Sequence, residues 1–195
     1  KRKLLRKASP NEIRSWQYSM QSMLPVLEDD EIPDDSGVHI EYNLPSTSKR
    51  IDFILTGRDA ENKEKAVIIE LKQWSEVQKT DKDGIVKTWL GGGLVETNHP
   101  SYQAWSYAAH IQDFNQTVRD DDIGMEPCAF LHNMSSGSVL RDSFYDQHLS
   151  NAPVFISRDA KKLSEFLKKH VKYGDSTEIM YRIEHGKIKP SKHLA

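Results

Sequence analysis

The sequence predicts an α/β fold in which a central mixed β-sheet is flanked by helices. A segment with helical spacing comes first, three strand-like segments follow it closely, and a second helical segment precedes further short apolar strands. The 195 residues suit one domain with its own core. The content of 37% hydrophobic and 29% charged residues is typical of a globular protein.

The first helix is expected to begin at Ser9-Pro10. Ser9 is a favourable N-cap, Pro10 suits the first helical turn, and Glu12 stands three positions after Ser9, as in a capping box. Apolar side chains then recur at helical spacing, namely Ile13, Trp16, Met20, Met23 and Leu24.

Strands are expected wherever short apolar runs lie between turn signals. The first half of the chain contains five such runs, at residues 38–44, 50–56, 66–72, 85–90 and 94–96. Gly91-Gly92-Gly93 separates the last two of these runs. Because no Gly-Lys-Ser/Thr follows, these glycines indicate a hairpin turn or a flexible loop rather than a phosphate-binding loop.

The second half is expected to alternate helices with buried strands. The predicted helices run from Pro100 to about Val118 and from a cap at Ser157 towards Gly174, and the predicted strands are residues 128–131, 154–156 and 178–184. We expect residues 1–186 to form one domain. The basic segment 187–195 is expected to be a linker or tail towards a further C-terminal module.

Composition limits the classes of function. The single cysteine, Cys128, excludes an intrachain disulfide and a cysteine zinc cluster, and is interpreted as a core thiol rather than a nucleophile. A reducing, cytoplasmic location is expected. No apolar run is long enough to cross a membrane. The net charge of -2 does not favour nucleic-acid binding by itself, although basic residues cluster locally.

The segment from residue 50 to residue 72 is the most informative part of the chain. If its two strands form a hairpin centred near Glu61, Asp52 lies opposite Glu70 and Ile54 lies opposite Ile68. Side chains alternate along strands, so Asp52, Glu70 and Lys72 share one face. The other face is expected to be wholly apolar, with Ile51, Phe53, Leu55, Val67, Ile69 and Leu71.

Two carboxylates and one amine at the same end of a hairpin suggest a cation site. Directly opposed side chains have Cβ atoms about 4.5–5.5 Å apart, and two carboxylates at that separation repel each other. A divalent cation removes this conflict, and oxygen ligands in an open, wet site suit Mg²⁺ or Mn²⁺. The alternative is that Asp52 and Glu70 are ordinary polar residues on a half-exposed sheet, with Lys72 as a counter-charge.

The pattern of Asp52 followed by Glu70-Leu71-Lys72 resembles the signature of the PD-(D/E)XK nuclease superfamily, although Arg50-Ile51-Asp52 replaces the nominal Pro-Asp. The resemblance implies a restriction-endonuclease-like core of order αβββαβ. Gln103 and Tyr107 form a Gln-x-x-x-Tyr pattern similar to that of the RecB-like exonucleases. From about residue 9 to the tail, the chain resembles the nuclease-like domain that precedes a Schlafen-type helicase module in certain bacterial proteins. The motifs of this resemblance are Glu-Leu-Lys-Gln-Trp, Gly-Gly-Gly and His-Pro-Ser-Tyr-Gln-Ala.

The resemblance implies a metal-dependent nuclease that hydrolyses phosphodiester bonds, with DNA favoured over RNA. Asp52, Glu70 and the carbonyl of Leu71 would bind Mg²⁺ or Mn²⁺, and Lys72 would act on the attacking water. It also implies a helicase or ATPase module in the same full-length chain, and a role in antiviral defence or in repair.

Several supporting residues have two interpretations. Glu12 is either a further metal ligand or only a helix-capping acid. Gln103, Tyr107 and His110 share one helical stripe, which either faces the acidic hairpin or is a partly exposed helix face. Trp74 and Trp89 are core residues by default, but they would stack on bases if they were exposed.

Two other functions remain open from the sequence. One is a nucleic-acid-binding domain on a nuclease scaffold, with little or no catalysis. The other is a docking or regulatory domain for an attached ATPase, which would neither bind nor cut nucleic acid.

Overall fold

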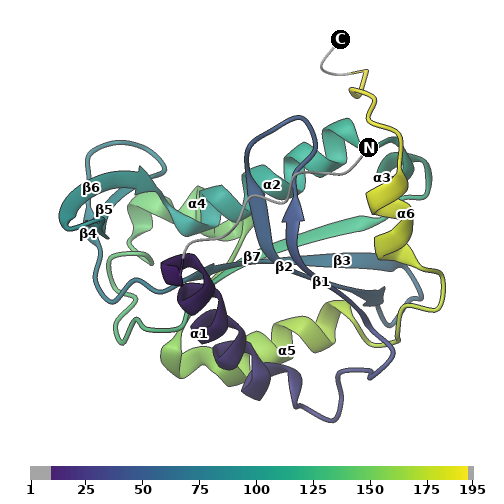
Figure 1. Cartoon of the computed structure of the whole chain (residues 1–195), viewed down its shortest axis with the longest axis horizontal. Coiled ribbons are helices and arrows are strands. Elements are labelled where there is room, and N and C mark those ends of the chain that lie inside the picture. The colour runs from purple at the N-terminus through teal and green to yellow at the C-terminus, as the bar shows by residue number, and fades with distance from the viewer. Residues whose placement is uncertain (1–9, 193–195) are drawn as a thin grey trace.

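The structure, a computed structural model, describes residues 10–192 and their side chains from Gln17 onward. A five-stranded mixed sheet lies between two layers of helices (Figure 1), as the sequence predicts. The helices are α1 (Pro10–Leu27), α2 (Pro100–Phe114), α3 (Gln116–Asp120), α4 (Asp146–Asn151), α5 (Ala160–His170) and α6 (Ile179–His185). The strands are β1 (Gly37–Asn43), β2 (Arg50–Arg58), β3 (Glu64–Lys72), β4 (Gln78–Lys79), β5 (Ile85–Leu90), β6 (Gly93–Asn98), β7 (Gly124–Leu131) and β8 (Val154–Ile156). None of the helices within residues 10–192 is long and apolar enough to span a membrane.

The main sheet has the strand order β1-β2-β3-β7-β8. Strand β2 pairs antiparallel with both β1 and β3, whereas β7 runs parallel to both β3 and β8. Parallel neighbours require a crossover connection, and α2 supplies it between β3 and β7. The sheet is therefore mixed because a meander of three strands continues into two parallel strands.

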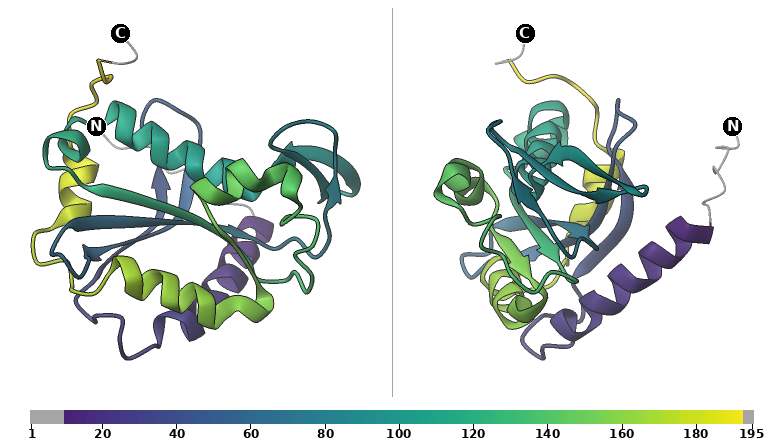
Figure 2. Two further views of the ribbon diagram at one scale, coloured as in Figure 1. Left: turned by 180° about the vertical axis from the view of Figure 1, so that it is seen from behind. Right: turned by 90° about the vertical axis from the view of Figure 1, so that its left-hand side faces the viewer.

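Helices cover both faces of the sheet (Figures 1 and 2). On one face, Phe53, Leu55 and Ile69 pack with side chains of α1 and α5. On the other face, Ile54 and Ile68 pack with α2, α3 and α6. Cys128 is buried in the first of these clusters, and burial raises the pKa of its thiol, which supports its interpretation as a core residue.

The predicted apolar face was wrong at one position. Ile51 packs in the cluster under α2 and α6, on the opposite face from Phe53. Glu41 of β1 has a left-handed φ of 57° and lies between the pairs Ile40–Phe53 and Tyr42–Ile51. Both strands change the face of their apolar side chains across this irregularity, so simple alternation fails there.

The helical predictions need four corrections. The segment predicted as a last strand, residues 178–184, is mostly α6, because Ile179, Met180 and Ile183 fit a helical face as well as a strand. The expected helix from Pro100 to Val118 is divided at Asn115, whose side chain accepts the backbone N–H of Val118 and caps α3.

The other two corrections concern a cap and an apolar position. The Ser157 hydroxyl donates to the carbonyl of Met134 instead of capping α5. Leu24 is exposed on α1, whereas Met20 and Met23 pack in the core. The expected cap Ser9 lies outside the described residues.

A second, three-stranded sheet projects beyond the C-terminal end of β3 (Figures 1 and 2). Its strands β5 and β6 pair from Ile85–Asn98 to Leu90–Gly93, which leaves Gly91 and Gly92 as a two-residue loop. Both glycines have positive φ, at 59° and 86°, as a hairpin turn of this length requires. The glycines thus form a hairpin turn, as the sequence predicts.

The segment after α6 contacts the domain. Gln116 donates its backbone N–H to Lys187, and the N–H groups of Lys189 and Ser191 donate to Phe114 and Asp113. Residues 187–191 are therefore held against the end of α2 and the start of α3. A linker from residue 187 onward stays a prediction.

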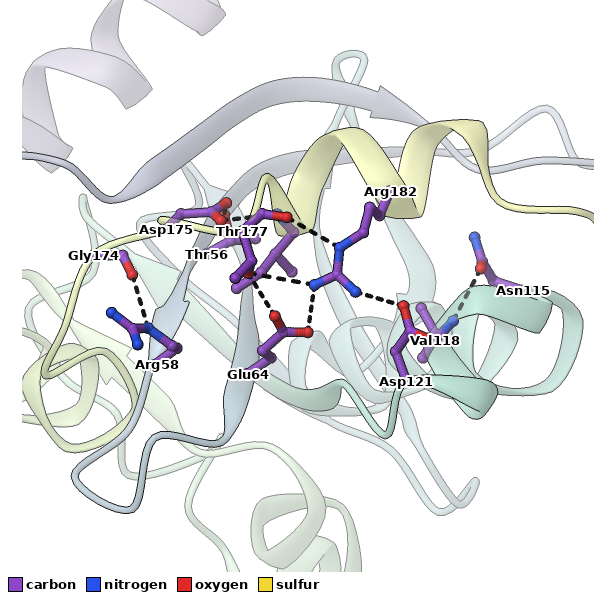
Figure 3. A network of polar contacts seen from close by, with 11 residues as sticks. Thr56, Arg58, Glu64, Asn115, Val118, Asp121, Gly174, Asp175, Thr177 and Arg182 are labelled. Atoms are coloured by element: carbon purple, nitrogen blue, oxygen red, sulfur yellow. Dashed lines mark hydrogen bonds and ion pairs between the residues drawn. The ribbon is translucent and has the colours of Figure 1, made fainter.

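One arginine joins three elements (Figure 3), and its helix α6 lies at the end of the main sheet away from the small sheet (Figure 1). Arg182 of α6 forms ion pairs with Glu64 at the start of β3 and with Asp121 after α3. Its Nε also donates to the carbonyl of Thr177, at 3.1 Å. Nearby, Thr56 donates to Asp175, at 2.6 Å. These bonds hold α6 and the turn before it against the end of β2 and the start of β3.

We expect Arg182→Met to lower the free energy of unfolding by roughly 1–2 kcal/mol, because two carboxylates lose charged hydrogen-bond donors in a partly solvent-screened setting. Urea unfolding followed by circular dichroism measures this change. Lys161→Met, which removes an exposed cation from α5, is the matched control. Equal stability of the two variants would show that the Arg182 contacts do not stabilise the fold.

Candidate functional site

The pairing of β2 with β3 brings the predicted acidic residues to one end of the sheet. Ile54 pairs with Ile68, as the hairpin centred near Glu61 predicts. Asp52 lies one residue beyond the last pair of the ladder, Phe53–Ile69, and its Oδ2 accepts the backbone N–H of Leu71 at 2.9 Å. Asp52 is therefore held against the segment of β3 that carries Glu70.

The carboxylate of Glu70 is the buried centre of the site, with the residue only 2% exposed. Its Oε1 accepts two short hydrogen bonds, from Lys72 Nζ at 2.6 Å and from Gln103 Nε2 at 2.6 Å. Its Oε2 is buried and accepts no hydrogen bond from any residue that the structure describes. One oxygen of this carboxylate thus accepts two hydrogen bonds, whereas the other, although buried, accepts none from the described residues.

Burial determines the electrostatics of both acids. It raises the pKa of Glu70 to about 7, against the lowering effect of the Lys72 charge, and the Asp52 charge raises it further. Burial also raises the pKa of Asp52, against the effects of the Leu71 N–H and the Lys72 charge. The repulsion expected from the sequence is present, but desolvation is the larger cause. A bound cation would offset both effects.

Gln103 and Tyr107 of α2 reach the acidic hairpin. Gln103 Nε2 donates both to Glu70 and to the Tyr107 hydroxyl, the latter at 2.8 Å. Burial, reinforced by the nearby Glu70 charge, raises the pKa of Tyr107 to about 12. Tyr107 therefore stays a neutral phenol. Its oxygen accepts the bond from Gln103, so its own O–H can still donate. His110 does not join them, because its Nε2 contacts the carbonyl of Pro45, at 2.9 Å.

Two further residues lie near the site, and contact with the acidic centre was predicted from the sequence for neither of them. Lys49, in the turn before β2, places its Nζ 5.8 Å from the centroid of the Tyr107 ring, and its charge acts on Glu70. Trp74 lies beneath Lys72, whose Nζ is 5.4 Å from the centroid of its ring. Lys49 belongs to no motif, so only the three-dimensional arrangement reveals it. Trp74 ends the Glu-Leu-Lys-Gln-Trp motif and is buried, which confirms its interpretation as a core residue.

Helix α1 approaches the same end of the sheet. Ser19 and His132 contact each other through Oγ and Nε2, at 3.2 Å, and both side chains are buried. His132 directly follows Leu131, the partner of Lys72 in the parallel ladder. Glu12 lies in the first turn of α1, but its side chain is outside the described part of the chain. Its role as a metal ligand stays a prediction.

The residues present fit a hard divalent cation. No cluster of three or more His, Cys, Asp or Glu side chains suitable for a metal occurs among the residues that the structure describes. Mg²⁺ commonly binds through one or two carboxylates and completes its shell with water and substrate phosphates. Asp52 and Glu70, with the unpartnered Oε2, supply such a pair.

Comparison with known protein families, curated proteins and solved structures found no match for this chain.

The position of Gln103 depends on His99, which caps the N-terminus of α2. The buried His99 ring accepts the backbone N–H of Ser101 at Nδ1, at 3.2 Å, and its Nε2 contacts the carbonyl of Leu140, at 3.0 Å. These partners require the neutral ring with its proton on Nε2. His99 thus serves as a structural cap, and it is not available as a phosphate ligand.

Burial lowers the pKa of His99 from 6.5 to about 4, so we expect the protein to lose stability as the pH falls through this interval. The folded state resists protonation while the unfolded chain accepts it. The stabilisation is therefore complete above pH 6.5 and declines below it. Between pH 7 and pH 5 the loss due to His99 is about 2 kcal/mol.

Urea unfolding of the wild type and of His99→Asn at both pH values measures this loss. Asn keeps a donor and an acceptor but does not titrate, so its stability should fall less on acidification. His185→Asn, an exposed position on α6, is the control and should behave like the wild type. An identical pH dependence for His99→Asn and the wild type would rule out this role.

Proposed function

We propose that this chain is a metal-dependent nuclease domain of the PD-(D/E)XK type, which hydrolyses phosphodiester bonds. The observation that carries the proposal is the buried Glu70 carboxylate, with Lys72 and Gln103 on one oxygen and no hydrogen-bond partner on the other. A structural carboxylate in a sheet would be expected to satisfy both oxygens. An acid that keeps one buried oxygen without a donor is instead suited to a cation.

The arrangement of the sheet supports the same proposal. Asp52 and the Glu70-Leu71-Lys72 segment lie on adjacent antiparallel strands, and α2 crosses from β3 to the parallel strand β7. This order is compatible with the αβββαβ core that the sequence resemblance implies. It also brings Gln103 and Tyr107 to the acidic end of the hairpin.

Each residue of the site has a proposed role. Asp52, Glu70 and the Leu71 carbonyl would hold Mg²⁺ or Mn²⁺. When bound, such a cation supplies Lewis-acid activation of a phosphoryl group and of a water nucleophile. Lys72 would orient the attacking water and neutralise the charge that develops on the phosphate. Gln103 would keep Glu70 oriented through Oε1.

The proposed substrate is nucleic acid, with DNA favoured over RNA. Lys72 and Lys49 both act on the electrostatics of the Glu70 carboxylate, and they place positive charge beside an otherwise acidic centre. Such a local basic rim can attract phosphates despite a formal net charge of -2. A helicase or ATPase module in the same full-length protein is part of the proposal.

We expect Asp52→Ala and Lys72→Ala to reduce metal-dependent cleavage by at least 10²-fold, roughly the loss caused by removing one strong electrostatic contact from an active site. The assay uses labelled single- and double-stranded DNA and RNA with Mg²⁺, Mn²⁺ or chelator. Lys161→Ala, on the exposed side of α5, is the control and should cut like the wild type.

Circular dichroism must show that both site variants remain folded. Cleavage at the wild-type rate by both folded variants would contradict the proposal. The absence of any cleavage by the wild type, together with binding of nucleic acid, would favour a binding domain on a nuclease scaffold.

Cation binding is tested separately from activity. Mn²⁺ at about 100 times its Kd should stabilise the wild type by about 2.7 kcal/mol, since it binds the folded state alone. Glu70→Gln removes one charged ligand while keeping a similar shape, so this stabilisation should be largely lost. Thermal unfolding with Mn²⁺ or chelator measures the effect. Equal stabilisation of the wild type and Glu70→Gln would place the cation elsewhere.

A further inference from the structure

The β5–β6 hairpin exposes several large apolar side chains. Trp89 is 61% exposed at the end of β5, and its neighbours Leu90, Leu94 and Val95 are also exposed. An apolar patch of this kind on a projecting element is typical of a binding surface. The Gly91-Gly92 turn at the tip of the hairpin also has open space beside it.

A hollow of about 200 Å³ lies between Trp89 and the segment that follows β3. Trp74 and Trp89 both line it, and Gln73 and Thr88 contribute polar groups. This volume is below the usual range for drug-sized ligands. It suits a single flat ring system with a few polar edges.

Two residues that line the hollow come directly after the proposed active site in the chain. Gln73 and Trp74 directly follow Lys72, and the Trp74 ring lies beneath the Lys72 ammonium, at 5.4 Å. Trp74 itself is only 8% exposed, so Trp89 is the indole of this hollow that a base of a bound strand can reach.

Hydrogen bonds hold strand β5 of the hairpin in place. Thr88 donates to the carbonyl of Glu76, at 2.7 Å, which ties β5 to the segment leaving β3. Tyr145 donates to the carbonyl of Ile85, at 2.9 Å, which ties the same strand to the main domain. Trp89 is thus exposed on an element whose backbone is fixed at several points.

The charges of the small sheet favour stacking over phosphate binding at this position. Lys82 pairs with Glu96, at 2.6 Å, and Lys79 pairs with Asp142, also at 2.6 Å. Lys87 lies 3.7 Å from Glu96. With these cations compensated, the hairpin offers an aromatic face rather than excess positive charge.

We propose that Trp89 is a base-stacking residue that receives an unpaired base of a single-stranded nucleic acid next to the catalytic centre. The inference deepens the proposed nuclease function and rests on it for the course of the strand. Stacking on an indole tolerates any base, since every base has a π-face. A duplex, whose bases already stack on one another, would gain less from this contact.

The test is equilibrium binding of a short fluorescent oligothymidylate, measured by anisotropy in the presence of chelator so that no cleavage occurs. Trp89→Ala should weaken binding roughly tenfold, and Trp89→Phe should restore most of it. Trp105→Ala is the matched control, because Trp105 is 39% exposed on α2 and lines a different hollow. A strand of equal length and charge with abasic sites should bind the wild type as weakly as oligothymidylate binds Trp89→Ala.

Equal affinities of the wild type, Trp89→Ala and Trp105→Ala would overturn the inference, as would equal binding of the abasic strand and oligothymidylate. A dimer of the wild type that Trp89→Ala dissociates would also overturn it, because the patch would then be a contact between copies. These outcomes leave metal-dependent cleavage untouched. Conversely, a wild type that cuts no strand refutes the nuclease proposal, whatever Trp89 contributes to binding.

Discussion

The rest of the site depends on the burial of one carboxylate, Glu70, in the middle strand of the main sheet. A buried charge without partners is very costly, so the surrounding structure must provide donors from fixed positions. Lys72 does so from the same face of β3, and Gln103 does so from α2. Because these two donors come from different elements, the helix must hold one register against the sheet. The geometry of the site thus depends directly on how α2 packs against the sheet.

Side chains at both ends of α2 tie the helix to other parts of the domain. His99 at the N-terminus joins the helix to the carbonyl of Leu140, and Asn115 beyond the C-terminus donates to the carbonyl of Ile183 in α6. The buried residues between them, Ala104, Ala108 and Ile111 among others, set the rotation of the helix. Gln103 and Tyr107 therefore reach Glu70 because of contacts that lie well away from the acids.

The sequence predicted the part of the structure that follows from strand periodicity. The pairing of Ile54 with Ile68, and hence the meeting of Asp52 with Glu70, follows from two apolar runs placed symmetrically about a polar loop. Ile51 was misplaced because Glu41 adopts a left-handed conformation that no local pattern announces. The segment that forms α6 was misassigned because a short run with Ile179, Met180 and Ile183 fits the periodicity of a strand as well as that of a helix. Only the packing of these side chains against the main sheet determines that the segment is helical. Lys49 could not be found by spacing, since tertiary contacts alone bring it to the site.

The position of the small sheet follows from the connection that contains it. The chain leaves β3 at Lys72 and must return to start α2 at Pro100, with Gln103 one turn later. Both ends of this excursion are fixed at the acidic centre, one by the Lys72–Glu70 ion pair and the other through the Gln103–Glu70 hydrogen bond. The first and last residues of this connection therefore lie near the acidic centre, however far the β5–β6 hairpin projects. The hollow between Trp74 and Trp89 therefore lies beside the start of this connection, because Gln73 and Trp74, which line it, directly follow Lys72 in the chain.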